Sequence, residues 1–160
     1  MTEPTRNSTI GTTLQPTVFL DIDGVLVTWR HNPNWGGIKL EFDPVCQIIL
    51  EDFLTKHPDC QIILSSTWRN ADRRMKRIAT QSPIIADTIT GTTEVGVSYP
   101  RHIEISDYLN YNPLQNYVIV DDETMPKKFA PKTVQTHNTY GLQPYHVQQM
   151  EEILYGKATV

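Results

Sequence analysis

The sequence is poor in the features that mark several large classes of protein. It has two cysteines among 160 residues, Cys46 and Cys60, which form neither a disulfide framework nor a metal-ligand spacing. No apolar run approaches the roughly 20 residues that span a bilayer. The N-terminus also lacks the basic and apolar stretches of a signal peptide. We therefore expect a cytoplasmic protein with reduced thiols and no membrane-spanning segment.

Other absences restrict the ligands. The five histidines are scattered, and no pair has the spacing of a zinc site. A Gly-rich P-loop is missing, which argues against a kinase activity in this chain. The net charge of -4 gives the chain no overall electrostatic attraction to nucleic acid or to an anionic membrane, although a local basic patch can still bind phosphate.

What is present fits one globular domain. The chain is 39% hydrophobic and 20% charged, as is usual for a soluble protein with a buried core. Residues 1–16 are polar, rich in threonine and without periodicity, which predicts a flexible tail. We place the folded domain at residues 17–160.

The apolar patterns predict strands that alternate with helices along this domain. The predicted strands are 17–20, 61–64, 84–89, 117–120 and 132–136, and the predicted helices are 44–56, 71–80, 101–109 and 144–154. Such alternation is typical of an α/β fold, here a three-layer Rossmann-like parallel sheet with helices on both faces.

Polar side chains follow three of these strands. Asp21 and Asp23 follow the first strand, residues 65–67 follow the second, and Asp121 and Asp122 follow the fourth. Ligands of parallel α/β sheets bind beyond the carboxyl ends of the strands. If the predicted fold is right, all three sets meet at one edge of the sheet.

The residue types at this edge indicate phosphate chemistry with a metal. Neighbouring carboxylates repel one another unless a cation lies between them or one is protonated. A metal would favour an ionised Asp21 as a nucleophile, and a raised pKa would make Asp23 a general acid. Asp121 and Asp122 add further oxygen ligands without cysteine or histidine, a set that suits magnesium.

A bound phosphate also needs hydrogen-bond donors and positive charge. The hydroxyls of Ser65 and Ser66 are suitable donors. Arg69 and Arg101 are the first candidates for the positive charge. The predicted basic helix offers further candidates, namely Arg73, Arg74, Lys76 and Arg77.

The motifs together resemble a known family. The segment 21–26, Asp-Ile-Asp-Gly-Val-Leu, resembles the first motif of the haloacid dehalogenase-like (HAD) superfamily of phosphatases. Segments 62–66 and 118–122 resemble its second and fourth motifs, and the likeness covers residues 17–154. The Ser-Ser-Thr-Trp-Arg stretch at 65–69 and the segment 101–105 resemble a compact subgroup linked to RNA-repair proteins.

The resemblance implies roles for individual residues. Asp21 would form an aspartyl-phosphate. Asp23 would act as acid and base, and its backbone carbonyl would bind magnesium. Either Asp121 or Asp122 would complete the metal site. The phosphoryl group would be bound by Ser65 or Ser66, and by the basic residue of the third motif, for which the family's usual position favours Arg101 over the basic helix.

The sequence also departs from the larger HAD proteins. About twenty residues separate Asp23 from the next helix, which leaves a minimal cap with residues 28–37 as the only obvious lid. An open site suits bulky substrates. The sequence therefore predicts a magnesium-dependent phosphomonoesterase acting on a phosphorylated small molecule or nucleic-acid end. The alternatives are a phosphoprotein phosphatase of the same superfamily and a binding module with little catalysis.

Overall fold

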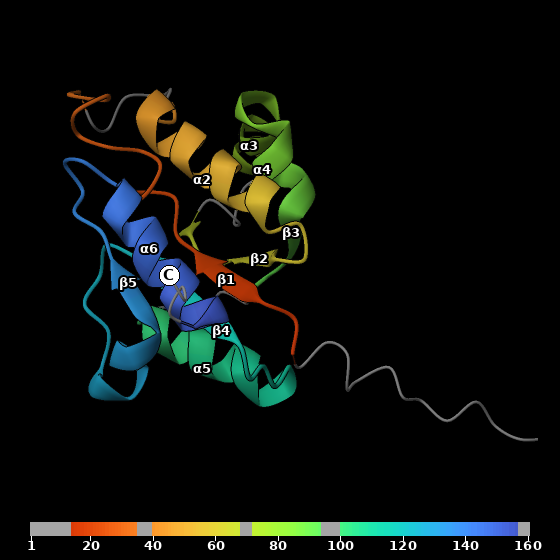
Figure 1. Ribbon diagram of the computed structural model, residues 1–160. Coiled ribbons are helices and arrows are strands. Elements are labelled where there is room, and N and C mark those ends of the chain that lie inside the picture. Colours follow the sequence, from red (N-terminus) through yellow and green to blue (C-terminus); the bar gives the residue numbers. More distant parts are fainter. Residues whose placement is uncertain (1–13, 35–39, 68–71, 94–99, 157–160) are drawn as a thin grey trace, which may run out of the picture.

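A computed structural model describes residues 14–34, 40–67, 72–93 and 100–156 (Figure 1). The predicted tail at 1–16 falls mostly outside these residues. Arg69 lies outside them as well, as does the last part of the predicted lid at 28–37.

The centre of the fold is a parallel sheet. Its strands are β1 (Thr17–Leu20), β2 (Gln61–Leu64), β3 (Ile89–Thr92), β4 (Tyr117–Asp121) and β5 (Thr133–Gln135), in the order β3-β2-β1-β4-β5. Every neighbouring pair is parallel. The central strand β1 is buried along its whole length, as expected for a sheet covered on both faces.

Helices cover both faces of this sheet (Figure 1). They are α2 (Pro44–Lys56), α3 (Asp72–Gln81), α4 (Pro83–Thr88), α5 (Arg101–Tyr111) and α6 (Pro144–Tyr155), with a 3₁₀ segment η2 (Lys127–Lys132). The three-layer Rossmann-like α/β fold is therefore confirmed. No helix in the described part of the chain is long and apolar enough to cross a bilayer.

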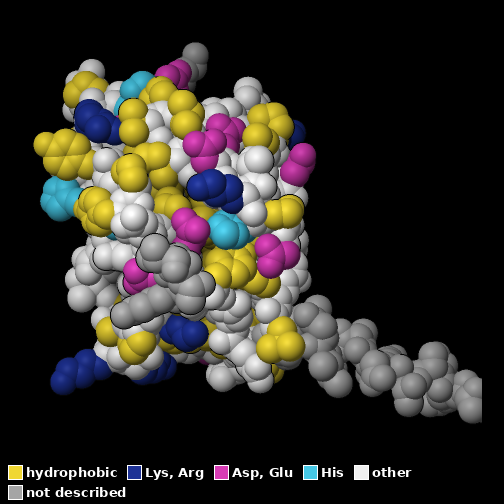
Figure 2. Space-filling view, viewed as in Figure 1, with side chains coloured by type: hydrophobic (Ala, Val, Ile, Leu, Met, Phe, Trp, Pro, Cys, Tyr) yellow, Lys and Arg dark blue, Asp and Glu magenta, His cyan; other side chains and the backbone are white. Residues whose placement is uncertain are grey.

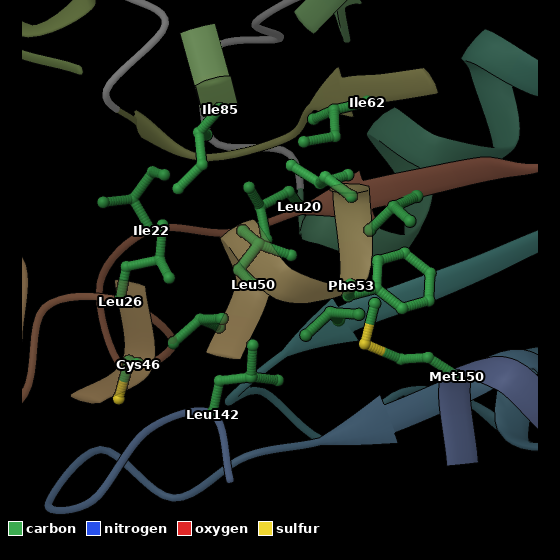
Figure 3. Packing of buried hydrophobic residues seen from close by; sticks show 14 of the residues in the cluster. Leu20, Ile22, Leu26, Cys46, Leu50, Phe53, Ile62, Ile85, Leu142 and Met150 are labelled. Atoms are coloured by element: carbon green, nitrogen blue, oxygen red, sulfur yellow. The ribbon is translucent and has the colours of Figure 1, made fainter. Parts of the chain in front are cut away.

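The alternation of side chains along the strands creates two separate cores. Leu20 and its neighbours Leu64 and Val120 face α2, α4 and α6, and form the larger core (Figure 3). Phe19 faces the other way and packs with α5, where its ring meets Tyr108 edge-on at 5.5 Å between ring centroids. Because successive residues of a strand point to opposite faces, Asp21 follows Leu20 on the α5 side.

Helix α2 starts where the sequence predicts. Asp43 caps α2 by accepting a hydrogen bond from the Val45 backbone N–H at 3.0 Å, and Pro44 occupies the first helical position. The same carboxylate accepts from the Thr28 hydroxyl at 2.8 Å and from the Arg30 guanidinium at 2.7 Å. Asp43 thus ties the loop after β1 to the start of α2.

The prediction of a strand at 84–89 is wrong. These residues lie mainly in α4, and β3 begins only at Ile89. Ser82 accepts a hydrogen bond from the Ile85 N–H at 3.2 Å, and Pro83 opens the helix. This Ser-Pro pair is a helix-start signal that outweighs the β-propensity of Ile84 and Ile85.

The described residues between β1 and α2 contain no helix and no paired strand, apart from an isolated bridge between Asp23 and Val27. This agrees with the predicted minimal cap. On the face shown in Figure 2, acidic and basic side chains are interspersed rather than gathered by sign.

Candidate active site

Asp21 lies directly beyond β1, at the carboxyl edge of the sheet. Its backbone N–H donates to the carbonyl of Val120 at 3.0 Å, and the Ser65 N–H donates to the carbonyl of Leu20 at 2.9 Å. The parallel ladder therefore continues one residue past the strand ends. Asp21 consequently lies beside Ser65 on one side and Asp121 on the other, and the residue is only 3% exposed.

A tight turn carries the chain away from Asp21. The N–H groups of Leu26 and Val27 both donate to the carbonyl of Ile22, at 2.9 and 3.1 Å. Gly24 has a φ of 83°, a conformation that favours glycine. A Cβ at Gly24 would lie 2.8 Å from the Cβ of Asp122, so the absence of a side chain lets Asp122 approach the turn.

Three carboxylates gather at this point. One oxygen each from Asp21, Asp121 and Asp122 lies within 4.8 Å of the others. Asp121 is fully buried and Asp122 is half-buried. Burying several acidic groups so closely costs free energy unless a positive charge compensates them.

Arg101 supplies part of this compensation. Its Nη1 lies 3.2 Å from Oδ1 of Asp21 and 2.9 Å from Oδ2 of Asp121, and its side chain is 11% exposed. Arg101 is the first residue of α5, where the helix dipole disfavours a positive charge. A cation placed against this local preference is consistent with a role in the site.

The electrostatic environment shifts both buried carboxyl groups. Burial raises the pKa of Asp21 to about 6, with Asp122 adding to the rise and Arg101 opposing it. Burial, together with the charge of Asp21, raises the pKa of Asp121 to about 9 against the opposing effect of Arg101. The closeness of the two carboxyl groups therefore disfavours the charged form of Asp121 when no further cation is bound.

The structure brings most of the predicted site residues together. Asp21, Asp121, Asp122 and Arg101 form one cluster, and Ser65 is the register neighbour of Asp21. Ser66 is the next residue along and is also buried. Asp23 is half-buried two residues after Asp21, and its carboxylate is not among the clustered oxygens.

Sequence reasoning missed two threonines at this edge. Thr136 follows β5, and its hydroxyl donates to the carbonyl of Gly24 at 2.7 Å, which fixes the turn. Thr93 follows β3 and is 1% exposed. The sequence signal for Thr93 was hidden because the strand before it was predicted too early in the chain.

A comparison with known families identifies the family of the chain. The family model of the HAD domain in Swiss Army Knife RNA repair proteins matches residues 17–147. The chain belongs to this family. No curated protein and no solved structure matches the chain.

This membership places the chain among HAD-type hydrolases. The matched residues 17–147 include every strand in the described part of the chain and the three clustered aspartates. HAD domains generally depend on Mg²⁺, and this member has a buried acidic cluster of three aspartates.

Proposed function

We propose that this HAD domain is a magnesium-dependent phosphomonoesterase with Asp21 as its nucleophile. The observation that carries the proposal is the position of Asp21 at the end of the central strand. There it lies within reach of Arg101 and of two further carboxylates. A charged, buried carboxylate beside a guanidinium is suited to attack on a phosphate ester.

The donor set at this point fits Mg²⁺. The three aspartates offer only hard oxygen atoms, and neither cysteine nor histidine joins the group among the described residues. Asp21, Asp121 and Asp122 would hold the ion. When bound, it would neutralise carboxylate charge and draw electron density from the phosphoryl oxygens.

Asp21 and Asp23 carry out the bond-forming and proton-transfer steps. A carboxylate oxygen of Asp21 forms a bond to phosphorus while the bond from phosphorus to the ester oxygen breaks. Asp23 gives a proton to the departing oxygen, then removes one from the water that attacks the aspartyl-phosphate. That second attack releases inorganic phosphate and regenerates Asp21.

Arg101 and Ser65 bind the group being transferred. Arg101 already contacts Asp21, so its guanidinium lies where it can offset negative charge on a phosphoryl group next to that residue. Ser65 is preferred over Ser66 because its backbone pairs in register beside Asp21. Arg69 remains a further candidate from the sequence.

Nucleotides and phosphorylated nucleic-acid ends are the favoured substrate class. The family description refers to RNA repair proteins, which supports such substrates. The minimal cap adds support, because a site without a large lid admits bulky molecules. A phosphoprotein would also fit an open site, and it is the alternative that a substrate panel must separate.

A phosphate-release assay tests the proposal. The panel contains 3′- and 5′-phosphorylated oligonucleotides, nucleotides, sugar phosphates and phosphopeptides, each with Mg²⁺ and with a chelator. We expect release that stops on chelation, and a loss on the order of 10⁴-fold for Asp21→Asn. Asp87→Asn, an exposed position on α4, is the matched control and retains full activity.

The outcomes are distinct. Release that survives chelation, or that survives Asp21→Asn, contradicts the mechanism. Preference for phosphopeptides over oligonucleotides would move the assignment to a phosphoprotein phosphatase. A folded wild-type protein that is inert toward the whole panel would instead favour a binding module on a HAD scaffold.

A further inference from the structure

Thr93 holds a buried hydroxyl that the fold does not use. The residue is 1% exposed, and among the described residues its Oγ1 has no hydrogen-bond partner. Nearly all buried hydroxyls in proteins are paired, because burial without a partner forfeits the hydrogen bonds that water provides. An orphaned hydroxyl next to a site is therefore a candidate for contact with a ligand.

A change of register brings Thr93 to its position. Ile89 pairs with Ile62, but the next pairs are Gly91 with Ile63 and Thr92 with Leu64, so β3 contains one extra residue. Without this residue Thr93 would lie beside Ser66. Such irregularities often re-aim a side chain next to an active site.

The extra residue of β3 is Thr90, which is exposed. Its hydroxyl donates to Oε1 of Gln61 at 2.8 Å. The Gln61 amide in turn donates to the hydroxyl of Thr17 at 3.0 Å. The shift in register is thus held by its own hydrogen bonds, independently of any ligand.

The shift places Thr93 in a row with the proposed nucleophile. The Thr93 N–H donates to the carbonyl of Leu64 at 3.0 Å, as the Ser65 N–H does to Leu20. Thr93, Ser65 and Asp21 are therefore register neighbours on three adjacent strands. All three are almost fully buried, with exposed fractions of 1%, 0% and 3%.

The three residues also share a face of the sheet. A Cβ at Gly91 would lie 3.3 Å from Ile63 and 3.9 Å from the Tyr108 hydroxyl, which belongs to α5. Residues two apart on a strand point the same way, so Thr93 faces α5 like Gly91. Asp21 faces α5 as well, since it contacts Arg101 at the start of that helix.

We propose that the Thr93 hydroxyl is a ligand of the substrate phosphoryl group, on the side away from Arg101. The inference rests on the proposed function. Adjacent strands are about 4.8 Å apart, so the backbones of Asp21 and Thr93 lie about 10 Å apart with Ser65 between them. A phosphoryl group bound over Ser65 and attacked by Asp21 directs an oxygen toward Thr93, which donates a hydrogen bond to it.

Substitutions at Thr93 separate this role from a structural one. Thr93→Val keeps the shape and removes the hydroxyl, whereas Thr93→Ser keeps the hydroxyl. Thr133→Val is the matched control, because the Thr133 hydroxyl donates to the carbonyl of Phe129 at 2.7 Å in the fold itself. Binding of inorganic phosphate with Mg²⁺ is measured by calorimetry, hydrolysis with p-nitrophenyl phosphate, and stability by urea unfolding.

The three variants should behave differently. We expect Thr93→Val to weaken phosphate binding and to lower kcat/KM by about 10- to 100-fold, the effect of one lost hydrogen bond to a charged group. Its urea midpoint stays unchanged or rises, because no internal hydrogen bond is lost. Thr93→Ser restores binding to within about threefold. Thr133→Val lowers the urea midpoint and leaves phosphate binding intact.

Other results separate the two proposals. Equal phosphate binding by wild type and Thr93→Val overturns the role of Thr93, whatever the enzyme hydrolyses. Phosphate binding that depends on Thr93 in a protein without hydrolytic activity upholds this site and overturns the phosphomonoesterase. A wild-type protein that neither binds phosphate nor hydrolyses p-nitrophenyl phosphate overturns both.

Discussion

The two halves of the sheet's carboxyl edge differ in charge. The half formed by β1 and β4 carries Asp21, Asp121 and Asp122 with Arg101 between them. Among the described residues, the half formed by β2 and β3 carries hydroxyls in the same row, from Ser65 and Thr93. In this row of described residues, the sheet thus presents a charged half at β1 and β4 and a neutral half at β2 and β3.

This difference teaches how the site divides its work. In the proposed mechanism, charge is concentrated where bonds to phosphorus form and break, although burial makes that arrangement costly and raises the pKa of Asp21 to about 6. Uncharged donors suffice where oxygens of the phosphoryl group are only bound. Variants that remove a charge from the charged half, or that displace one of its carboxylates, therefore test whether the two halves have different roles.

Removing the positive charge of Arg101 from the charged half has the largest expected effect on activity. Arg101→Met should lower kcat/KM by about 10²- to 10³-fold. Arg101→Lys should retain most of the activity, because a single nitrogen, Nη1, contacts both carboxylates in the wild type. Steady-state kinetics measure kcat/KM for both variants. An equal loss of kcat/KM in Arg101→Met and Arg101→Lys would contradict a role of the positive charge.

Removing one carboxylate should weaken metal binding. We expect Asp121→Asn to raise the Kd for Mg²⁺ by about 100-fold, measured by calorimetry. Exposed Asp59→Asn is the control and binds as wild type does. An unchanged Kd in Asp121→Asn would show that the ion is held elsewhere.

Asp121, together with Asp21, should govern how the stability of the fold depends on pH. The pKa values of Asp21 and Asp121 rise from 3.8 to about 6 and about 9, so the folded state keeps protons that the unfolded chain has released. Without divalent metal, the free energy of unfolding should therefore fall as pH rises from 4 to 9. Asp121→Asn should flatten the part above pH 6 in urea titrations.

A smaller effect on metal binding is expected from changes in the turn at Gly24, which lies next to the charged half. Gly24→Ala and Gly156→Ala each place a side chain at a positive φ, since the φ angles are 83° and 82°. Such a backbone conformation costs a residue other than glycine about 1–3 kcal/mol. Only Gly24→Ala also forces Asp122 aside, because nothing lies within 4 Å of a Cβ at Gly156.

The two alanine variants should therefore separate in metal binding. Gly24→Ala should bind Mg²⁺ more weakly than the wild type in calorimetry, whereas Gly156→Ala should bind it as the wild type does. Identical behaviour of the two would mean that the contact between Gly24 and Asp122 has no bearing on the site.

The charged half was largely predictable from the sequence. Asp21 directly follows β1, and Asp121 and Asp122 lie at the end of β4, two strands whose apolar, β-branched runs are easy to recognise. The position of Arg101 at the start of a helix was also predictable. The contact of Arg101 with both Asp21 and Asp121 was not, because it depends on how α5 packs against the sheet.

The neutral half was less predictable, for two physical reasons. Ser82 and Pro83 start a helix within an apolar run, and this displaced the predicted strand. The extra residue in β3 changes which side chain lies beside Ser65, and such a shift leaves no mark in the hydrophobic pattern. Thr93 could be recognised only once the register was known.

The central claim is that Asp21 carries the phosphoryl group during turnover. The most direct test is to quench the enzyme with acid while it hydrolyses p-nitrophenyl phosphate with Mg²⁺, and to map the modified peptide by mass spectrometry. We predict one added phosphoryl group on the peptide that contains Asp21, and none in Asp21→Asn. A phosphoryl group on another residue, or turnover without any phosphorylated enzyme, would contradict the account.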